Sequence, residues 1–217
     1  MSCSINLNNI SYKKDISFLF ENINLDLGHQ EKIAIIGQNG VGKSTLLKIM
    51  AGLKEQTCGE ITLFHNPIKR KKDFEQFRSE IGYLPQDISS FFICITVIED
   101  IMFSLQTLGV DKAKAYQKSI KILKDLDLLH LKNRVIYELS GGEQKLVALA
   151  ALLVKEPKIL LLDEPTNALD IKSEKRIIDI LNSIAKSMII VSHNKDTINS
   201  LTHTIYELVD KSLIQIY

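Results

Sequence analysis

The chain has 217 residues, of which 45% are hydrophobic and 24% charged, and its formal net charge is +1. This length fits one large domain or two small ones with a substantial core. A net charge so close to zero gives no global field that would indicate a nucleic-acid or acidic-lipid partner. The three cysteines are widely spaced and form no Cys/His cluster, so neither a metal site nor a disulfide framework is indicated.

The sequence contains no stretch that would cross a bilayer. The first residues lack the long apolar segment of a signal peptide. The longest apolar runs are Phe91–Ile98, which a threonine interrupts, and Leu146–Val154. Both are far shorter than the roughly 20 residues that a spanning helix needs. We therefore expect any membrane role to depend on a partner.

The first quarter of the chain is typical of strands followed by a loop and a helix. Roughly alternating apolar residues predict strands near residues 5–10 and 23–27. The β-branched run Lys32–Ile36 predicts a third strand. A buried helix is predicted over Lys43–Ala51, and Gly52 would end it.

The next segment is predicted to hold two short strands and then a helical region. The strands are expected at Glu60–Phe64 and Ile81–Leu84, with an exposed loop and a short helix over residues 66–80 between them. Residues Val97–Leu129 have a helical pattern. Its apolar positions recur every three or four residues, at Tyr116, Ile120, Leu123 and Leu126.

The second half predicts a helix and two strand–helix units. The helix covers Glu143–Val154. The units are Lys158–Leu162 with Ser173–Ala185, and Met188–Val191 with the segment after it, while Leu213–Tyr217 is strand-like. Short continuous apolar strands are typical of a parallel sheet that is covered on both faces. The predicted fold class is therefore α/β with a helical insertion.

A glycine-rich loop between the third strand and the first helix matches the phosphate-binding pattern G-x4-G-K-[ST]. Its residues are Gly37, Gln38, Asn39, Gly40, Val41, Gly42, Lys43, Ser44 and Thr45. The glycines let backbone N–H groups turn toward phosphate oxygens, and the helix N-terminus adds partial positive charge. Lys43 would reach the β- and γ-phosphates, and Ser44 would ligate Mg²⁺. The alternative is a chance glycine turn, which the strand–loop–helix context disfavours.

Two adjacent carboxylates, Asp163 and Glu164, follow the aliphatic run Ile159–Leu162. Ligands of α/β sheets bind at the C-terminal ends of the strands, which is where this pair would lie. We expect Asp163 to hold Mg²⁺, commonly through water, and Glu164 to orient or polarise an attacking water. The alternative is a solvated turn, which becomes less attractive beside a phosphate loop.

A third motif, Ser140-Gly141-Gly142-Glu143, precedes a helix. It offers a second set of backbone donors for an anion. Taken alone, the motif is better explained as a helix N-cap, with Ser140 and Glu143 forming a capping box.

The motifs in their order resemble those of the nucleotide-binding subunit of ATP-binding-cassette (ABC) proteins, over nearly the whole chain. In sequence they are the phosphate loop, Gln86 in Tyr83–Gln86, Ser140–Glu143, Asp163–Glu164, Ala168–Asp170, and His193 in Val191–His193. The resemblance implies one ABC ATPase domain over residues 1–217. It implies a P-loop NTPase core with a mostly parallel sheet, an N-terminal antiparallel β-subdomain and a helical insertion at about residues 88–138.

The resemblance also implies roles for single residues. Tyr12 is similar to the aromatic residue that stacks on adenine, although a lone tyrosine is often only a filler. Gln86 is similar to the glutamine that contacts Mg²⁺ and water and couples to a transmembrane partner; its alternative is an exposed loop amide. His193 is similar to the histidine that contacts the γ-phosphate, although a lone histidine after a strand is usually structural. Asp170 lies in the loop that links two ATP sites.

In the family, Ser140–Glu143 of one subunit would cap the γ-phosphate held by the other. The chain has one copy of each motif. The resemblance therefore implies a head-to-tail dimer, with itself or with a related ATPase, around two ATP molecules with Mg²⁺. It further implies transmembrane transporter subunits as partners, no nucleic acid, and a peripheral location on the cytoplasmic face of the membrane.

Residues 87–109 resemble the corresponding stretch of energy-coupling-factor ATPases for cobalt or nickel uptake. The spacing is kept at Thr96-Val97, Glu99-Asp100, Phe103 and Leu108-Gly109, and Lys145–Ala150 is also similar to that branch. The segment departs from the branch at Ser89–Phe92. The alternative is a generic entry to the helical region, with Phe91 and Phe92 packed as core.

Other function classes stay open at this point. One is an ABC ATPase for another cargo, such as an amino acid, an anion or an exported compound. A soluble ABC mechanoenzyme would carry a long coiled-coil insertion or a second cassette, and the sequence has neither. A P-loop kinase would have no need of Ser140–Glu143 or His193.

Overall fold

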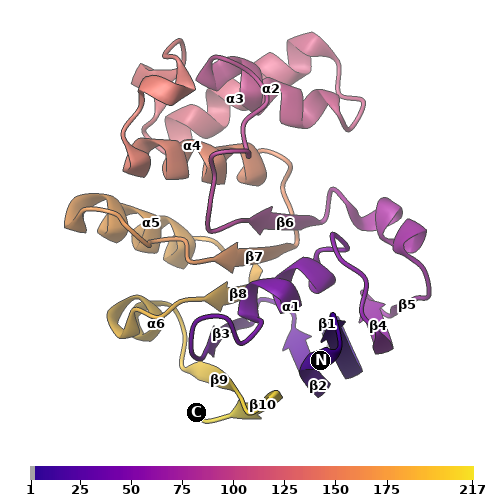
Figure 1. Cartoon of the computed structure of the whole chain (residues 1–217). Helices are drawn as coiled ribbons and strands as arrows, with labels where there is room; N and C mark the ends of the chain where they lie inside the picture. The colour runs from indigo at the N-terminus through magenta and orange to yellow at the C-terminus, as the bar shows by residue number, and fades with distance from the viewer. Residues whose placement is uncertain (1–2) are drawn as a thin grey trace.

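The computed structural model describes residues 3–217, whose elements form two sheets with helices around them (Figure 1). The first sheet is antiparallel in the order β2-β1-β4-β5. These strands are β1 (Cys3–Lys14), β2 (Ser17–Gly28), β4 (Cys58–Leu63) and β5 (Asn66–Ile68).

The second sheet has the order β10-β9-β3-β8-β7-β6 and is parallel except for β10. These strands are β3 (Lys32–Ile36), β6 (Ile81–Leu84), β7 (Ile159–Asp163), β8 (Ser187–Val191), β9 (Thr204–Val209) and β10 (Ser212–Gln215). The fold class predicted from the sequence, a mostly parallel core sheet with an N-terminal antiparallel one, is confirmed.

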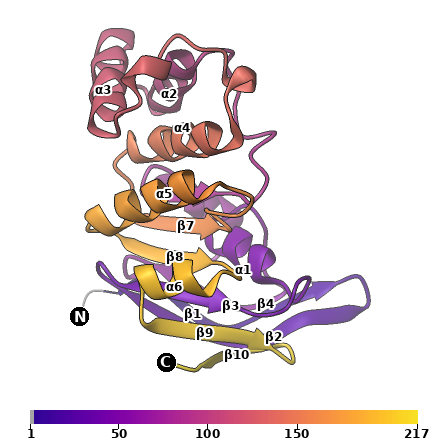
Figure 2. The same ribbon diagram turned by 90° about the vertical axis from the view of Figure 1, so that its left-hand side faces the viewer.

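The helices pack on both faces of the parallel sheet and extend beyond it. They are α1 (Lys43–Met50), α2 (Val97–Gln106), α3 (Lys112–Asp125), α4 (Gly141–Leu153), α5 (Ile171–Ser183) and α6 (Lys195–Leu201), with 3-10 turns η1 (Lys71–Phe77), η2 (Leu129–Leu131) and η3 (Ile136–Glu138). Figure 2 shows α2 and α3 beyond α4, far from β1 and β2. No helix in residues 3–217 is both long and apolar enough to cross a membrane.

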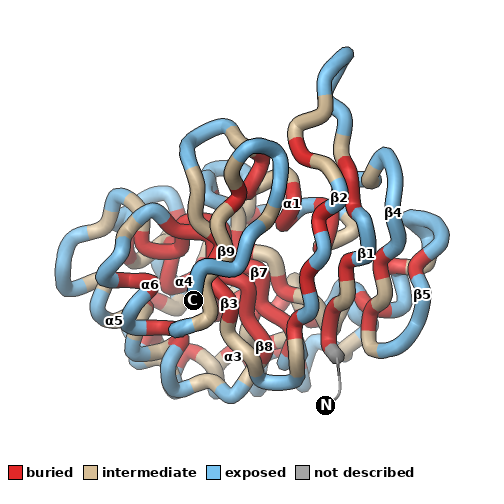
Figure 3. Tube along the Cα trace, turned by 90° about the horizontal axis from the view of Figure 1, so that it is seen from below, coloured by how far each residue is buried: buried red, intermediate tan, exposed pale blue. Residues whose placement is uncertain are grey.

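Strand β7 explains why the parallel strands are continuously apolar. Its residues alternate between two hydrophobic cores, as successive side chains on a strand must. Ile159 and Leu161 join the core that contains α1 and the antiparallel sheet, whereas Leu160 and Leu162 join the core that contains α2, α4 and α5. Figure 3 shows the resulting buried stripe along β3, β8 and β7. Asp163 at the end of β7 and Glu164 directly after it are therefore carried by a rigid strand.

The helical region differs from its sequence prediction. The predicted pattern over Val97–Leu129 is interrupted, because α2 ends at Gln106 and α3 begins at Lys112. Tyr116, expected on the apolar face, is 46% exposed. The buried residues of α3 are Ala115, Ser119 and Leu123. Two of these are small, so the helix packs closely against its neighbours through a face that a hydrophobicity pattern underestimates.

Other elements also depart from the expectation. Residues 66–80 are not simply an exposed loop with a short helix, because β5 pairs with β4, and Phe74 and Phe77 of η1 are buried. Strand β9 was not predicted. Helices α4 and α5 begin two residues before their expected starts, because Ser140 and Asp170 act as N-caps. Both Phe91 and Phe92 pack against the core, with their ring centroids 5.3 Å apart.

Candidate active site

The glycine loop between β3 and α1 adopts a backbone that only glycine accommodates. Gly37 and Gly42 have φ angles of 144° and 114°. A Cβ atom on Gly37 would lie 2.5 Å from the carbonyl oxygen of Leu208, and one on Gly42 would lie 2.9 Å from the side chains of Leu19 and Phe20. The loop is therefore packed against β9 and β2 while its N–H groups remain available for an anion.

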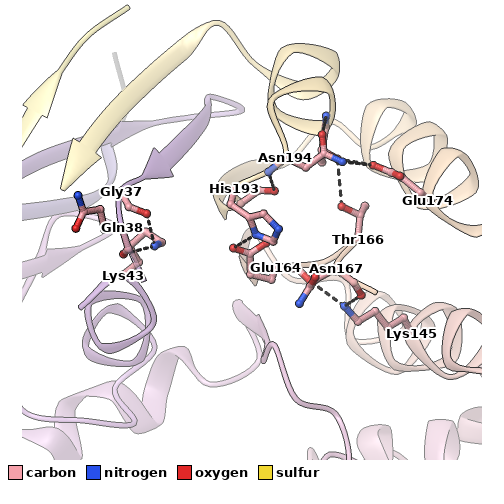
Figure 4. A network of polar contacts seen from close by, with 12 residues as sticks. Gly37, Gln38, Lys43, Lys145, Glu164, Thr166, Asn167, Glu174, His193 and Asn194 are labelled. Atoms are coloured by element: carbon pink, nitrogen blue, oxygen red, sulfur yellow. Dashed lines mark hydrogen bonds and ion pairs between the residues drawn. The ribbon is translucent and has the colours of Figure 1, made fainter. Parts of the chain in front are cut away.

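The ammonium of Lys43 lies inside this loop (Figure 4). Its Nζ donates hydrogen bonds to the carbonyl oxygens of Gly37, at 2.7 Å, and Gln38, at 2.9 Å. Burial lowers the pKa of Lys43, while the charges of Glu164 and Asp163 act in the opposite direction. The positive charge of Lys43 is therefore held by the loop and interacts electrostatically with both carboxylates.

Asp163 is the last residue of β7 and is only 2% exposed. The Tyr83 hydroxyl donates a hydrogen bond of 3.5 Å to its Oδ2. Its Oδ1 is buried and has no hydrogen-bond partner within residues 3–217. Burial raises the pKa of Asp163, with the Ser44 and Tyr83 hydroxyls opposing that shift, and burial followed by the Asp163 charge raises the pKa of Tyr83.

This orphaned oxygen is what a site for a hard cation requires. Ser44 and Gln86 line the same cavity as Asp163, so three oxygen-bearing side chains face one space. Mg²⁺ prefers oxygen ligands, usually one or two carboxylates together with substrate phosphates. The residues present therefore fit Mg²⁺.

Glu164 follows β7 in a left-handed backbone conformation, with φ 50°. For a residue with a side chain, this conformation costs about 1–2 kcal/mol. Its N–H donates to the carbonyl oxygen of Val191 at 2.8 Å, and its Oε1 lies 2.9 Å from Nδ1 of His193. The strained turn thus directs a buried carboxylate toward the histidine at the end of the neighbouring strand β8.

A cavity of about 470 Å³ brings most of the predicted residues together. Its lining includes Tyr12, Asn39, Gly40, Gly42, Lys43, Ser44, Thr45, Gln86, Asp163, Glu164 and His193. Lys54 also lines it, with Nζ 4.8 Å from the ring centroid of Tyr12. Among the loop residues, Gly37, Gln38 and Val41 shape the loop without lining the cavity. The volume is in the range of ordinary ligand pockets.

Ser140–Glu143 lies outside this cavity. Its capping box is formed: the N–H of Ser140 donates to Glu143 Oε2 at 2.9 Å, and the N–H of Glu143 donates to Ser140 Oγ at 3.3 Å. Asp170 likewise caps α5 by accepting from the N–H groups of Lys172 and Ser173. A Cβ on Gly142 would lie 2.4 Å from Ser173 Oγ, so the motif packs against the start of α5.

Several polar residues that lie around the site have no role there that was predicted from the sequence. Lys145 of α4 is buried and donates to carbonyl oxygens of the turn after β7. Glu174 of α5 accepts hydrogen bonds from Asn194 and Thr197, next to His193 (Figure 4). The sequence does carry a signal for Lys145, because it directly precedes the apolar run Leu146–Val154 and buried lysines are almost always paired.

The phosphate loop before α1 and the carboxylates at the end of β7 define a P-loop ATPase. In agreement, a family model described as ABC transporter matches residues 20–167. A Brucella suis protein provisionally named as an ABC transporter ATP-binding protein is 42% identical over 198 residues, covering 91% of this chain and 82% of the relative. The energy-coupling factor transporter ATP-binding protein EcfA1 of Thermotoga maritima is 34% identical over 200 residues, covering 91% and 75%.

Solved structures agree with the sequence relatives. The structure of cbiO1 from Clostridium perfringens, part of the ABC transporter complex cbiONQ, has a TM-score of 0.86 at 27% identity and covers 99% of this chain and 88% of that chain. A dimeric ATP-binding cassette in a post-hydrolysis state with ADP and Pi has a TM-score of 0.86 at 26% identity, covering 98% and 99%. The chain belongs to the ABC transporter family as an ATP-binding subunit that hydrolyses ATP.

Proposed function

We propose that this chain is the ATPase of an energy-coupling-factor importer that takes up cobalt or nickel ions. The observation that carries the proposal is the segment of residues 87–109, which leads from the cavity residue Gln86 into α2. Its similarity to that branch is supported by the identity with the energy-coupling factor subunit of Thermotoga maritima. An ABC ATPase for another cargo is the alternative.

The roles of the site residues follow from where their side chains lie. Lys43 and the N–H groups of Gly37–Thr45 would bind the phosphates, and Tyr12 would stack on adenine. Glu164 is buried beside the cavity and would accept a proton from, or orient, the attacking water. His193 contacts Glu164 and would donate a hydrogen bond to the γ-phosphate. Gln86 would contact Mg²⁺ and water in the cavity and would couple the site to a membrane partner.

Ser44, Gln86 and Asp163 would hold Mg²⁺. When bound, this ion would neutralise charge that develops on the phosphate oxygens. In this assignment, Mg²⁺ would provide the polar partner that Asp163 Oδ1 otherwise lacks.

The position of Ser140–Glu143 outside the cavity supports a paired arrangement. The N–H groups of Gly141 and Gly142, which the capping box does not use, would cap the γ-phosphate held by a second subunit, placed head to tail, and Asp170 would lie between the two sites. The second subunit would be another copy or a related ATPase. The pair would dock on transmembrane subunits at the cytoplasmic face, with residues 88–138 forming a helical insertion within one domain over residues 1–217.

Metal uptake tests the cargo. Cells that lack their own cobalt and nickel importers would receive this chain with its membrane subunits, and accumulation of radioactive Co²⁺ or Ni²⁺ would be measured. We expect uptake with the wild-type chain and none above background with Glu164→Gln. Equal, background-level uptake for both, together with active ATP turnover of the wild type, would assign the chain to another cargo.

The stacking role of Tyr12 is tested by its affinity for ATP. Tyr12→Ala is expected to weaken ATP binding roughly 5- to 150-fold, because stacking of a base on an aromatic ring contributes about 1–3 kcal/mol. Tyr12→Phe keeps the ring and serves as the control, with affinity within about twofold of wild type. Titration with a fluorescent ATP analogue would measure both. Equal affinity for Tyr12→Ala and Tyr12→Phe would remove Tyr12 from the adenine site.

A further inference from the structure

Lys145 is a charged residue in the first half of helix α4. It is 6% exposed, and the helix residues that follow it, Leu146–Leu152, are all buried and hydrophobic. Its Nζ donates to the carbonyl oxygen of Glu164 at 2.8 Å and to that of Asn167 at 3.1 Å. Figure 4 shows this ammonium beneath the turn that follows β7. An ammonium buried in this way is costly, and its two hydrogen bonds to carbonyl oxygens offset part of that cost.

Both acceptors belong to the turn that carries the reactive carboxylate. This turn is strained at each end, because Glu164 and Ala168 have φ angles of 50° and 60°. Besides the contact of the Glu164 carboxylate with His193, three other hydrogen bonds restrain it: from Glu164 N–H to the carbonyl oxygen of Val191, from Asn167 N–H to that of Glu164, and between the hydroxyls of Thr166 and Thr197 in α6. Lys145 supplies the restraint that comes from α4, and it acts directly on the main chain of the turn.

The same helix begins at the motif Ser140–Glu143. Lys145 is five residues after the N-cap Ser140, a rise of about 7.5 Å along a helix. A displacement of the start of α4 is therefore passed along a stiff element to the ammonium, and from there to the main chain of Glu164.

We propose that Lys145 is a positioning residue that holds the Glu164 turn in its reactive conformation and couples it to the helix that serves the second nucleotide. The coupling rests on the paired arrangement proposed above. The positioning of Glu164 does not, because both hydrogen bonds lie within one chain.

Steady-state ATP turnover by the purified chain tests this. Lys145→Met keeps an unbranched apolar stem that is one atom shorter, but it removes the donors. It should lower kcat about 10- to 100-fold, the effect expected from a small displacement of a reacting group, with the KM for ATP within about twofold of wild type. The paired arrangement predicts a sigmoidal dependence of the wild-type rate on ATP, and in Lys145→Met this dependence should become closer to hyperbolic. Lys145→Arg restores N–H donors and should recover kcat to within about threefold.

Lys155→Met is the matched control. Lys155 follows α4 and is partly buried, but its side chain makes no hydrogen bond or ion pair in the described part of the chain. It should retain wild-type kcat and KM. Lys145→Met should remain folded, with a melting temperature within a few degrees of wild type, because the loss of a hydrogen bond costs about 1 kcal/mol. If this variant does not fold, Lys145→Leu, which also lacks donors, replaces it under the same criteria.

Three results would overturn the proposal. They are a kcat for Lys145→Met within twofold of wild type, a loss that appears only in KM, and a loss that Lys155→Met reproduces. Failure of the paired arrangement is a separate result. It would appear as a wild-type chain that stays monomeric and whose rate depends hyperbolically on ATP concentration. In that case the kcat comparison still decides the positioning of Glu164.

Discussion

Replacing Glu164 with glutamine should lower the rate of ATP turnover by at least about 100-fold while ATP affinity stays within about threefold of wild type. A positioned general base contributes about 10²–10⁴-fold to a rate, and glutamine cannot accept the proton of the attacking water. The amide is similar in size to the carboxylate and can still contact His193, whose Nδ1 lies 2.9 Å from Glu164 Oε1. The pocket for ATP is therefore preserved. Release of phosphate and titration with labelled ATP would measure the two quantities.

Glu156→Gln is the control for this substitution. Glu156 also has a left-handed backbone, with φ 56°, but it is exposed and does not line the cavity. Its amide variant should hydrolyse ATP at the wild-type rate. Undiminished turnover by Glu164→Gln, or an equal loss in both variants, would contradict the assignment of Glu164 as the catalytic carboxylate.

Lys43→Ala should act on binding itself. Its ammonium lies within the phosphate loop and opposes the charges of Asp163 and Glu164, which would otherwise repel the phosphates. Hydrogen bonds to charged groups contribute about 1.5–3 kcal/mol, so we expect ATP affinity to fall roughly 10- to 150-fold. Isothermal titration calorimetry with ATP and Mg²⁺ would measure the change.

The control for this prediction lies on the same helix. Lys48 of α1 is exposed and does not line the cavity, so Lys48→Ala should bind ATP with nearly wild-type affinity. Were Lys43→Ala to bind as tightly as Lys48→Ala, the phosphate loop would not be the ATP site.

Much of the site was predictable because its chemistry depends on local sequence. A glycine loop of this spacing between an apolar strand and a helix is typical of phosphate binding, and two carboxylates after a buried strand lie at the ligand-binding end of the sheet. The distant residues Tyr12, Gln86 and His193 were placed only through the family resemblance. The structure brings all three to the same cavity, while their roles stay predictions.

The restraints on Glu164 could not be predicted in the same way. Its left-handed backbone arises from hydrogen bonds to Val191 and Lys145, which are distant in sequence. No local pattern encodes such contacts. The capping box at Ser140 was foreseen as an alternative to anion binding, and it is formed, while anion binding by the motif stays a prediction.

The elements missed in the fold have a common physical cause. Most residues of β9 are only partly buried, so the strand has no clear apolar pattern, and it is fixed by parallel pairing with β3. The packed face of α3 depends on the small residues Ala115 and Ser119, which a hydrophobic pattern undervalues, whereas Tyr116 projects outward. Tertiary contacts determine these two features, so the intrinsic strand and helix preferences of the residues do not reveal them.

A second subunit is proposed to complete the nucleotide site through Ser140–Glu143. Size-exclusion chromatography with light scattering of Glu164→Gln, in ATP with Mg²⁺ and separately in ADP, tests this arrangement most directly. We expect a particle of twice the 24.5 kDa chain mass in ATP and a monomer in ADP. A Glu164→Gln monomer in both nucleotides, together with wild-type turnover per chain that is independent of protein concentration, would contradict a shared site.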